Sequence, residues 1–171
     1  MSRVDVAKSS WVMIATLLVQ HTLLDQIRFA GAHPDVTVLL PVAAGYVAGP
    51  DRGAGFGFAS GLIADLFLPT TYGLSALVFC LAGYLTGLLT GSLVKTSVVV
   101  SSLLLTGAAT ATVVAYATVG ALIGTSAMLT VYLVPALVAT LPAVLILAYP
   151  MSRAVSWAVP FRGAAEALPV R

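Results

Sequence analysis

Two ionisable side chains, His21 and Asp65, lie inside long apolar stretches of the sequence. An ionised carboxylate at the centre of a membrane helix costs about 2.5–3.5 kcal/mol, so its presence there calls for a structural or chemical reason. Together with a serine such as Ser60 or Ser75, the two residues have the types needed for a hydrolytic triad. Nothing in their spacing marks an aligned base, a nucleophile and an oxyanion site. The sequence therefore favours no reaction centre.

The other reactive residue types are too few for a metal or cofactor site. The chain has two histidines and one cysteine, and they show none of the paired spacings of zinc sites. Cys80 stands alone in an apolar run, which is typical of a small buried side chain. The glycines of 53–57 lack the full dinucleotide-binding spacing and follow no predicted strand. We predict that the protein is not an enzyme, holds no metal or cofactor, and does not bind nucleic acid, since its basic residues are scattered.

The composition indicates that these residues lie in a membrane. Of the 171 residues, 60% are hydrophobic and 8% are charged, whereas about 25% are charged in an ordinary soluble domain. The 57 residues from Thr96 to Ser152 contain no Asp, Glu, Lys or Arg. A helix needs about 20 apolar residues to cross the hydrocarbon core, so this stretch holds two helices and a turn. The predicted fold class is an all-α integral membrane protein.

Six apolar segments predict a single six-helix transmembrane domain over residues 1–150, followed by a short cytoplasmic, interfacial tail over 151–171. Turn-like strings rich in Gly and Pro separate the segments in the first half of the chain. The second and third segments are short for a full crossing, and Pro41 is expected to kink the second. The six segments are Ser10–Leu24, Val36–Gly49, Gly53–Leu68, Gly73–Leu93, Ser97–Val119 and Ser126–Tyr149.

The basic residues predict the orientation. With both termini in the cytoplasm, seven of the eight Lys and Arg residues lie on the cytoplasmic side and only Arg28 lies outside, as the positive-inside rule requires. We therefore expect a multi-pass membrane protein with both termini in the cytoplasm. A cleaved signal peptide ending near Ala30–Ala32 is a rival interpretation of the N-terminus. Against it, the polar stretch Asp25–Arg28 separates the apolar run from the small residues more widely than is usual.

Asp65 and His21 are expected to lie at the same depth in the membrane. Each follows by 13 residues a basic residue at the inner boundary, Arg52 and Lys8 respectively, which is roughly 20 Å along a helix. We hypothesise that the two side chains form an intramembrane polar pair, directly or through water. The alternative is that Asp65, four residues before Pro69, reaches the outer headgroups and is solvated there.

Glycines recur every four residues in two ladders of the third and fourth segments. Because four residues make about one helical turn, each ladder forms a flat groove on one helix face and lets another helix approach closely. The neighbour is either another helix of this chain or a helix of a partner protein, and the sequence leaves both open. The ladders are Gly53, Gly57 and Gly61, and Gly83, Gly87 and Gly91.

Three strings in the same two segments resemble the bacterial rod shape-determining protein MreD family. They are G-F-A-S-G-L-I-A-D-L at 57–66, G-L-S-A-L at 73–77 and G-Y-L-T-G at 83–87. The likeness covers about residues 10–91, and beyond these it rests on hydropathy and length. The resemblance implies that the matching residues shape a partner-binding or helix-packing region. These residues are Gly57, Gly61, Asp65, Gly73, Gly83, Tyr84 and Gly87.

The resemblance also implies a function. Such a protein is a non-enzymatic scaffold subunit of the cell-elongation complex, or elongasome, which makes lateral peptidoglycan and maintains rod shape. The implied partners are MreC, the polymerase RodA with its penicillin-binding transpeptidase, the MreB filament and membrane lipid. The family is similar in fold to the substrate-binding subunits of energy-coupling-factor vitamin transporters, which supplies the alternative function. The A-x-x-x-A docking signature of those subunits is missing from 9–24, where Ala15 is the only alanine.

Overall fold

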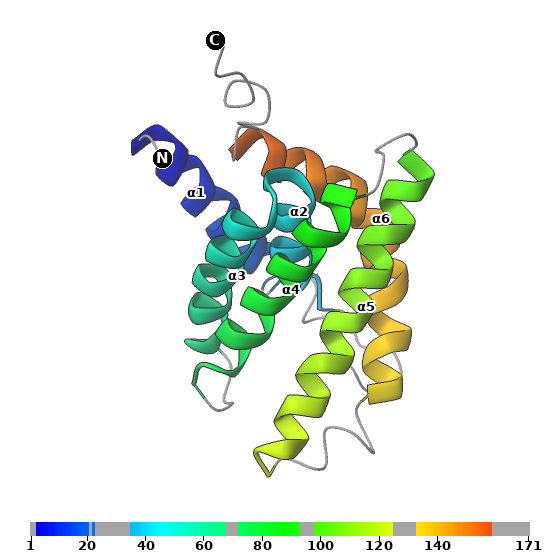
Figure 1. Ribbon diagram of the computed structural model, residues 1–171. Coiled ribbons are helices and arrows are strands. Elements are labelled where there is room, and N and C mark those ends of the chain that lie inside the picture. Colours follow the sequence, from blue (N-terminus) through cyan, green and yellow to red (C-terminus); the bar gives the residue numbers. More distant parts are fainter. Residues whose placement is uncertain are drawn as a thin grey trace.

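The structure is a computed structural model that describes residues 3–20, 22, 35–67, 72–92, 98–124 and 133–158. The described ranges contain six α-helices and no strand, which confirms the predicted all-α class (Figure 1). The helices are α1 (Arg3–Val19), α2 (Leu39–Ala48), α3 (Pro50–Asp65), α4 (Leu74–Ser92), α5 (Val98–Leu122) and α6 (Leu133–Ala158).

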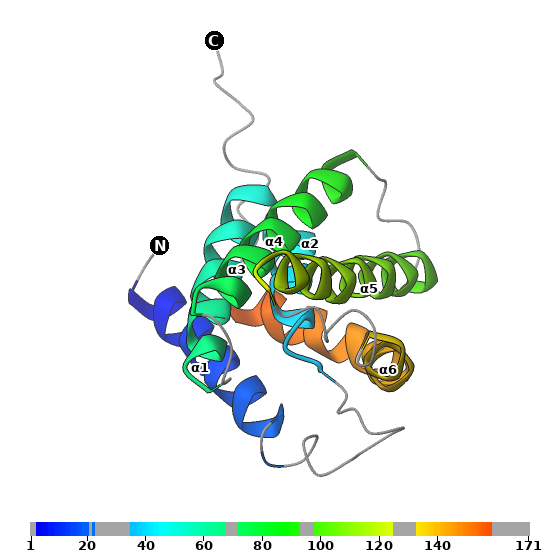
Figure 2. The ribbon, with the colours of Figure 1, turned by 90° about the horizontal axis from the view of Figure 1, so that it is seen from below.

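Three helices form the centre of the bundle. The most extensive contacts join α3 to α4, and α2 packs against both of them. Viewed from below, α1 and α5 lie on opposite sides of this group (Figure 2). The helices run alternately up and down, so the start of α1 and the end of α6 lie at the same end of the molecule (Figure 1).

Helix length separates α5 and α6 from the other described helices. Among the described helices, α5 and α6 are long and apolar enough to cross a membrane, over Val99–Leu122 and Val134–Ala158. By contrast, α2 has ten residues and spans about 15 Å, half of a hydrocarbon core of about 30 Å. The prediction of six crossings therefore stays a prediction.

The start of α2 differs from the predicted one. The helix begins at Leu39, three residues later than predicted, because the chain first makes a turn in which the Leu39 amide donates to the carbonyl of Val36 at 3.0 Å. Pro41 then falls in the first turn of α2, where a backbone amide has no helical partner in any case. Pro41 therefore breaks no hydrogen bond of α2, and the kink expected there has no cause.

The end of α6 also differs from the predicted one. The helix continues past Tyr149 to Ala158 and contains Pro142 and Pro150, and its direction changes along its length (Figure 1). Proline inside a helix removes a hydrogen bond and bends the axis. Val155 and Ala158 are fully buried, so the first part of the predicted interfacial tail packs into the fold. The predicted domain boundary at residue 150 falls inside this helix.

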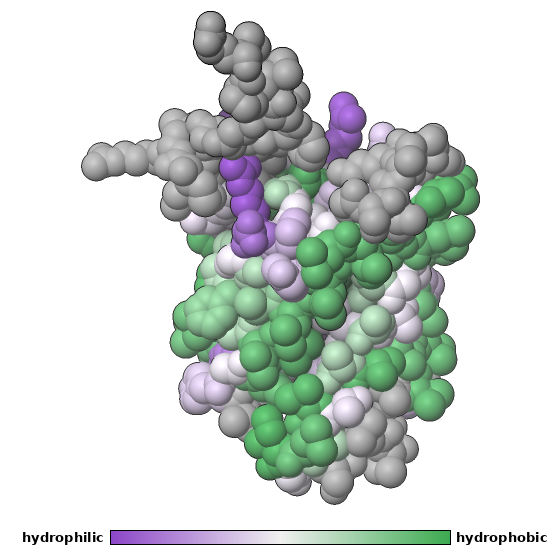
Figure 3. All heavy atoms as spheres, in the orientation of Figure 1, coloured by the Kyte–Doolittle hydropathy of each residue, from purple (hydrophilic) through white to green (hydrophobic). Residues whose placement is uncertain are grey.

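The outer wall of the bundle is apolar. Large side chains such as Trp11, Leu103 and Ile146 are 62–75% exposed. In the face shown in Figure 3, hydrophobic atoms cover the wall, while the most strongly hydrophilic groups lie toward the end that carries the start of α1. A helix that is apolar all round, as α5 is, and yet is mostly exposed suits a lipid environment.

Candidate functional site: a glycine-packed helix unit closed by Asp65

The first glycine ladder faces α4 inside the same chain. A Cβ added at Gly61 would lie 2.5 Å from the Ser75 carbonyl oxygen and 2.6 Å from the Cα of Ala76. One added at Gly57 would meet the Phe79 carbonyl even more closely. All three obstacles are backbone atoms, which cannot rotate away as a side chain can. The third and fourth helices therefore touch backbone to backbone along this ladder.

The second ladder, on α4, faces the start of α3 in the same way. A Cβ added at Gly87 would lie 2.5 Å from the Cα of Pro50, and one at Gly83 would lie 2.6 Å from the carbonyl carbon of Gly53. In α2, a Cβ at Gly45 would lie 3.0 Å from the amide nitrogen of Gly87. Close packing of this kind takes the place of the hydrophobic force that lipid removes between helices.

These contacts show the structural role of four glycines of the two ladders. Gly57, Gly61, Gly83 and Gly87 are buried against neighbouring helices of this chain. They hold α2, α3 and α4 together and do not themselves present a surface to another protein. We call these three helices the glycine-packed unit.

Asp65 connects the end of α3 to the start of α4. Its carboxylate is 1% exposed and accepts hydrogen bonds from the backbone amides of Gly73 at 2.8 Å, Ser75 at 3.2 Å and Ala76 at 3.4 Å. The first amides of a helix have no partner within the helix, and a carboxylate there also favours the positive end of the helix dipole. Asp65 thus caps α4 from the preceding helix, which explains a carboxylate in apolar surroundings.

The buried position of Asp65 does not agree with the expectation that it is solvated at the outer headgroups. His21 lies outside the described residues, so the His21–Asp65 pair stays a prediction. The carboxylate has further lone pairs beyond the three amides that it accepts from. A pair with His21 would therefore add to the cap and not replace it.

The remaining residues of the predicted site have separate structural roles. Gly73 has φ = +93°, a left-handed conformation that glycine adopts without strain, and it lies where the turn delivers its amide to Asp65. Tyr84 is 40% exposed on the outside of α4. Ser60 is buried and donates to the carbonyl of Gly57 at 3.1 Å, within its own helix.

Among the described residues, neither candidate serine has its hydroxyl on Asp65, and His21 lies outside them. Ser75 contacts Asp65 through its amide, and the Ser60 hydroxyl is engaged elsewhere. Cys80 is half-buried and not fully buried as its sequence context suggested. In the part of the chain that the structure describes, no group of three or more His, Cys, Asp or Glu side chains could hold a metal ion.

Sequence reasoning missed the amides of Ser75 and Ala76, because backbone donors have no side-chain signature. The available signal was the order of elements. An aspartate ends one apolar segment, and Gly73-Leu74-Ser75 opens the next. A carboxylate so close in sequence to a helix start is a candidate cap.

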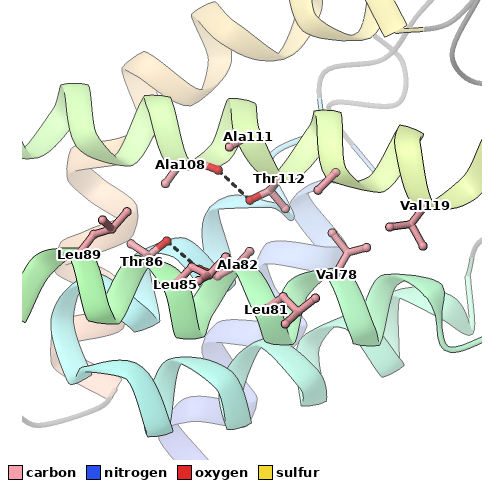
Figure 4. A pocket seen from close by; sticks show the side chains of 11 residues that line it. Val78, Leu81, Ala82, Leu85, Thr86, Leu89, Ala108, Ala111, Thr112 and Val119 are labelled. Atoms are coloured by element: carbon pink, nitrogen blue, oxygen red, sulfur yellow. Dashed lines mark hydrogen bonds between the residues drawn. The ribbon is translucent and has the colours of Figure 1, made fainter.

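A shallow groove runs along the outside of the unit, between α4 and α5 (Figure 4). Its volume is about 140 Å³. Two threonines line it, and each turns its hydroxyl to its own helix, Thr86 to the Ala82 carbonyl at 2.7 Å and Thr112 to the Ala108 carbonyl at 2.8 Å. The groove therefore offers shape and apolar contact but little polar chemistry.

Comparison with known proteins assigns the chain to a family. A family model described as rod shape-determining protein MreD matches residues 6–153, which is most of the chain. No match was found among the curated proteins or among the solved structures. With its long apolar helices and the family match, the protein is an α-helical membrane protein. The chain belongs to the MreD family of rod shape-determining proteins.

Proposed function

We propose that the protein is a non-enzymatic scaffold subunit of the complex that synthesises lateral peptidoglycan. In this role it lies in the plasma membrane as a multi-pass protein with both termini in the cytoplasm. It binds MreC, positions RodA and its penicillin-binding transpeptidase near the MreB filament, and so maintains rod shape. The observation that carries the proposal is the family match over residues 6–153.

The glycine-packed unit supports a holding role. Three helices whose backbones touch have little room to rearrange, since packed interiors resist changes of even one methyl group. Asp65 accepts from three backbone amides, so it serves as a helix cap and is a poor candidate for a catalytic base. The described site is therefore suited to holding helices together and not to catalysing a reaction.

The outer face of α4 is the surface that we assign to MreC. Four large side chains follow one another at helical spacing on this face and are 40–52% exposed. Residues at such spacing line one side of a helix. The opposite side of α4 is fastened to α3, so the stripe is presented on a rigid support. We call this stripe the α4 face; it consists of Leu77, Leu81, Tyr84 and Leu88.

Cysteine crosslinking tests this surface. In a Cys80→Ser background, Leu81→Cys and Tyr84→Cys should crosslink to cysteines in the membrane-spanning segment of co-expressed MreC. Val138→Cys and Ile146→Cys on α6, which are 57% and 75% exposed, serve as matched controls and should give few adducts. Adducts confined to the two α6 positions would contradict the assignment of the α4 face.

Co-purification tests the function as a whole. The scaffold proposal expects MreC and wall-synthesis enzymes to be recovered with the tagged protein from membranes. The alternative role, a substrate-binding subunit of an energy-coupling-factor vitamin transporter, expects an ATPase pair and a bound vitamin instead. Recovery of that second set would overturn the scaffold proposal.

A further inference from the structure

A cavity of about 490 Å³ lies between α1, α2 and α3. This volume falls within the range of roughly 300–1,000 Å³ that is typical of small-molecule sites. The interior is lined by apolar side chains of all three helices. They are Met13, Ala44, Ala48, Phe56 and Ala59. The cavity is separate from the glycine-packed contacts and from the α4 face.

Polar residues also line this cavity. Ser9 and Ser10 contribute from α1, and Asp51 and Arg52 contribute from the first turn of α3. A guanidinium and a carboxylate therefore stand at neighbouring positions beside an apolar chamber. Such a site suits a ligand with an apolar chain and a head that carries both charges.

The polar residues lie at the level expected for lipid headgroups. Lys8 directly precedes Ser9, and its ammonium lies 4.9 Å from the centre of the Trp157 ring. Tryptophan and basic residues are enriched at the membrane–water interface. The apolar lining extends away from this level, since Ala59 lies seven residues beyond Arg52 in α3, or about 10 Å along the helix.

The size of the cavity argues for a lipid chain and against a partner helix. With a diameter of 10–12 Å and a pitch of 5.4 Å, one turn of helix fills roughly 500 Å³. Even the whole empty space, about 1020 Å³ with its open side included, would hold only about two turns, whereas a membrane-spanning helix has more than five. A thin acyl chain can enter a space of this size along its length.

We propose that this cavity binds one glycerophospholipid with a zwitterionic, primary-amine headgroup. One acyl chain occupies the chamber, and the phosphate lies against Arg52 and the serine hydroxyls of α1. The ammonium lies against Asp51. The two charges of the head thereby meet two opposite charges of the protein, which a purely anionic head cannot do. This inference is independent of the scaffold role.

Matched glycine substitutions test whether the lipid occupies the cavity. Gly55 lines it and Gly107 lies on α5, and a Cβ added at either position meets no atom within 4 Å. Native mass spectrometry of the full chain in detergent, with phosphatidylethanolamine added, should find one retained lipid. Gly55→Leu should lose most of this lipid because the leucine side chain projects from the wall into the space that the acyl chain would occupy, and Gly107→Leu should retain it.

Charge substitutions test the headgroup, in competition between phosphatidylethanolamine and phosphatidylglycerol. Arg52→Gln should weaken retention of both lipids by about tenfold, since it removes a charge-assisted hydrogen bond to phosphate. Asp51→Asn should abolish the preference for the ethanolamine head. Arg153→Gln, at an exposed position of α6, is the control and should change neither.

Three outcomes would overturn the proposal. In the first, Gly55→Leu retains as much lipid as the unmodified protein, which would indicate only lipid on the outer wall. In the second, Asp51→Asn keeps the headgroup preference. In the third, Gly55→Leu loses a co-purifying protein and keeps its lipid, which would place a protein segment in the cavity. Thermal unfolding checks that each variant is folded; should Gly55→Leu unfold, the two charge variants on the helix surface still decide the question.

Discussion

The glycines at the contact between α3 and α4 and the glycine of α5 have opposite surroundings. Toward α3, the glycines lie against backbone atoms, and a Cβ at Gly61 would lie 2.5 Å from a carbonyl oxygen. On α5, Gly107 is exposed and does not line the groove of about 140 Å³ that remains between α4 and α5, and a Cβ added there would meet no atom within 4 Å. A glycine in an apolar helix therefore becomes a packing residue only where a second backbone lies opposite it.

The two acidic residues of α3 also differ in their surroundings, one being buried and the other exposed. Asp65, at the end of the helix, is 1% exposed and accepts from three amides. Asp51, in the first turn, is exposed and lines the cavity beside α1. The first carboxylate is committed to structure, while the second is accessible to a ligand. The first substitutions below compare a residue that is buried in contacts with one that is exposed.

The largest effect is expected from Gly57→Leu. The new side chain must push α4 away from α3, and overpacking of this kind destabilises by about 3 kcal/mol or more because backbone atoms are in the way. Gly107→Leu is the matched control and should change stability little, or raise it by up to about 1 kcal/mol through helix propensity. Thermal unfolding in detergent measures both. Equal melting temperatures for the two variants would remove the distinction between the glycines packed at the α3–α4 contact and the exposed glycine of α5.

The next largest effect is expected from Asp65→Ala. Loss of the cap leaves buried amides of the first turn of α4 without an acceptor and should cost about 2–3 kcal/mol. Asp65→Asn keeps one acceptor oxygen and should cost about half as much. Asp51→Ala removes an exposed carboxylate near a helix start and should cost under about 1 kcal/mol. Chemical unfolding in mixed micelles can rank the three variants, and a cost for Asp51→Ala that matches Asp65→Ala would contradict the cap.

A smaller effect is expected from Gly73→Ala. Its φ of +93° strains any residue with a Cβ, at about 1–2 kcal/mol, although the added Cβ would meet no atom within 4 Å. Gly55→Ala has the same open surroundings with helical backbone and should be neutral or slightly stabilising. The difference in melting temperature between these two alanine variants isolates the backbone strain. No difference would mean that the turn relaxes.

The smallest effect is expected from the predicted pair of His21 and Asp65. A double-mutant cycle of His21→Ala and Asp65→Asn should give a coupling of about 0.6 kcal/mol, the average for contacts between membrane helices. The cycle must therefore be measured with replicates that resolve a few tenths of a kcal/mol. A coupling near zero would leave the backbone amides as the partners that matter for Asp65.

Most of the helices could be predicted from the sequence, and the errors in their predicted ends have local causes. The apolar segments all correspond to helices, with ends shifted by several residues. At Pro150 the sequence suggested an end, but α6 continues to Ala158 because Val155 and Ala158 are buried in the fold. Tertiary burial there outweighs the break that a proline usually causes.

The candidate site was visible in part. The four-residue spacing of Gly57 and Gly61 correctly marks a face for close helix contact. Neither spacing nor composition could say whether the neighbour belonged to this chain. Asp65 stood out because of its apolar surroundings, but its partners are amides, and every residue other than proline carries one.

By itself, the sequence determined the membrane class and the number of helical segments. Both follow from local sums, since each residue adds its own transfer free energy to the segment that carries it. The tertiary structure alone decided which glycines meet a backbone, which donors satisfy Asp65, and where a cavity remains. Those outcomes depend on how far apart two helices lie, a distance that is set by all the side chains between them at once.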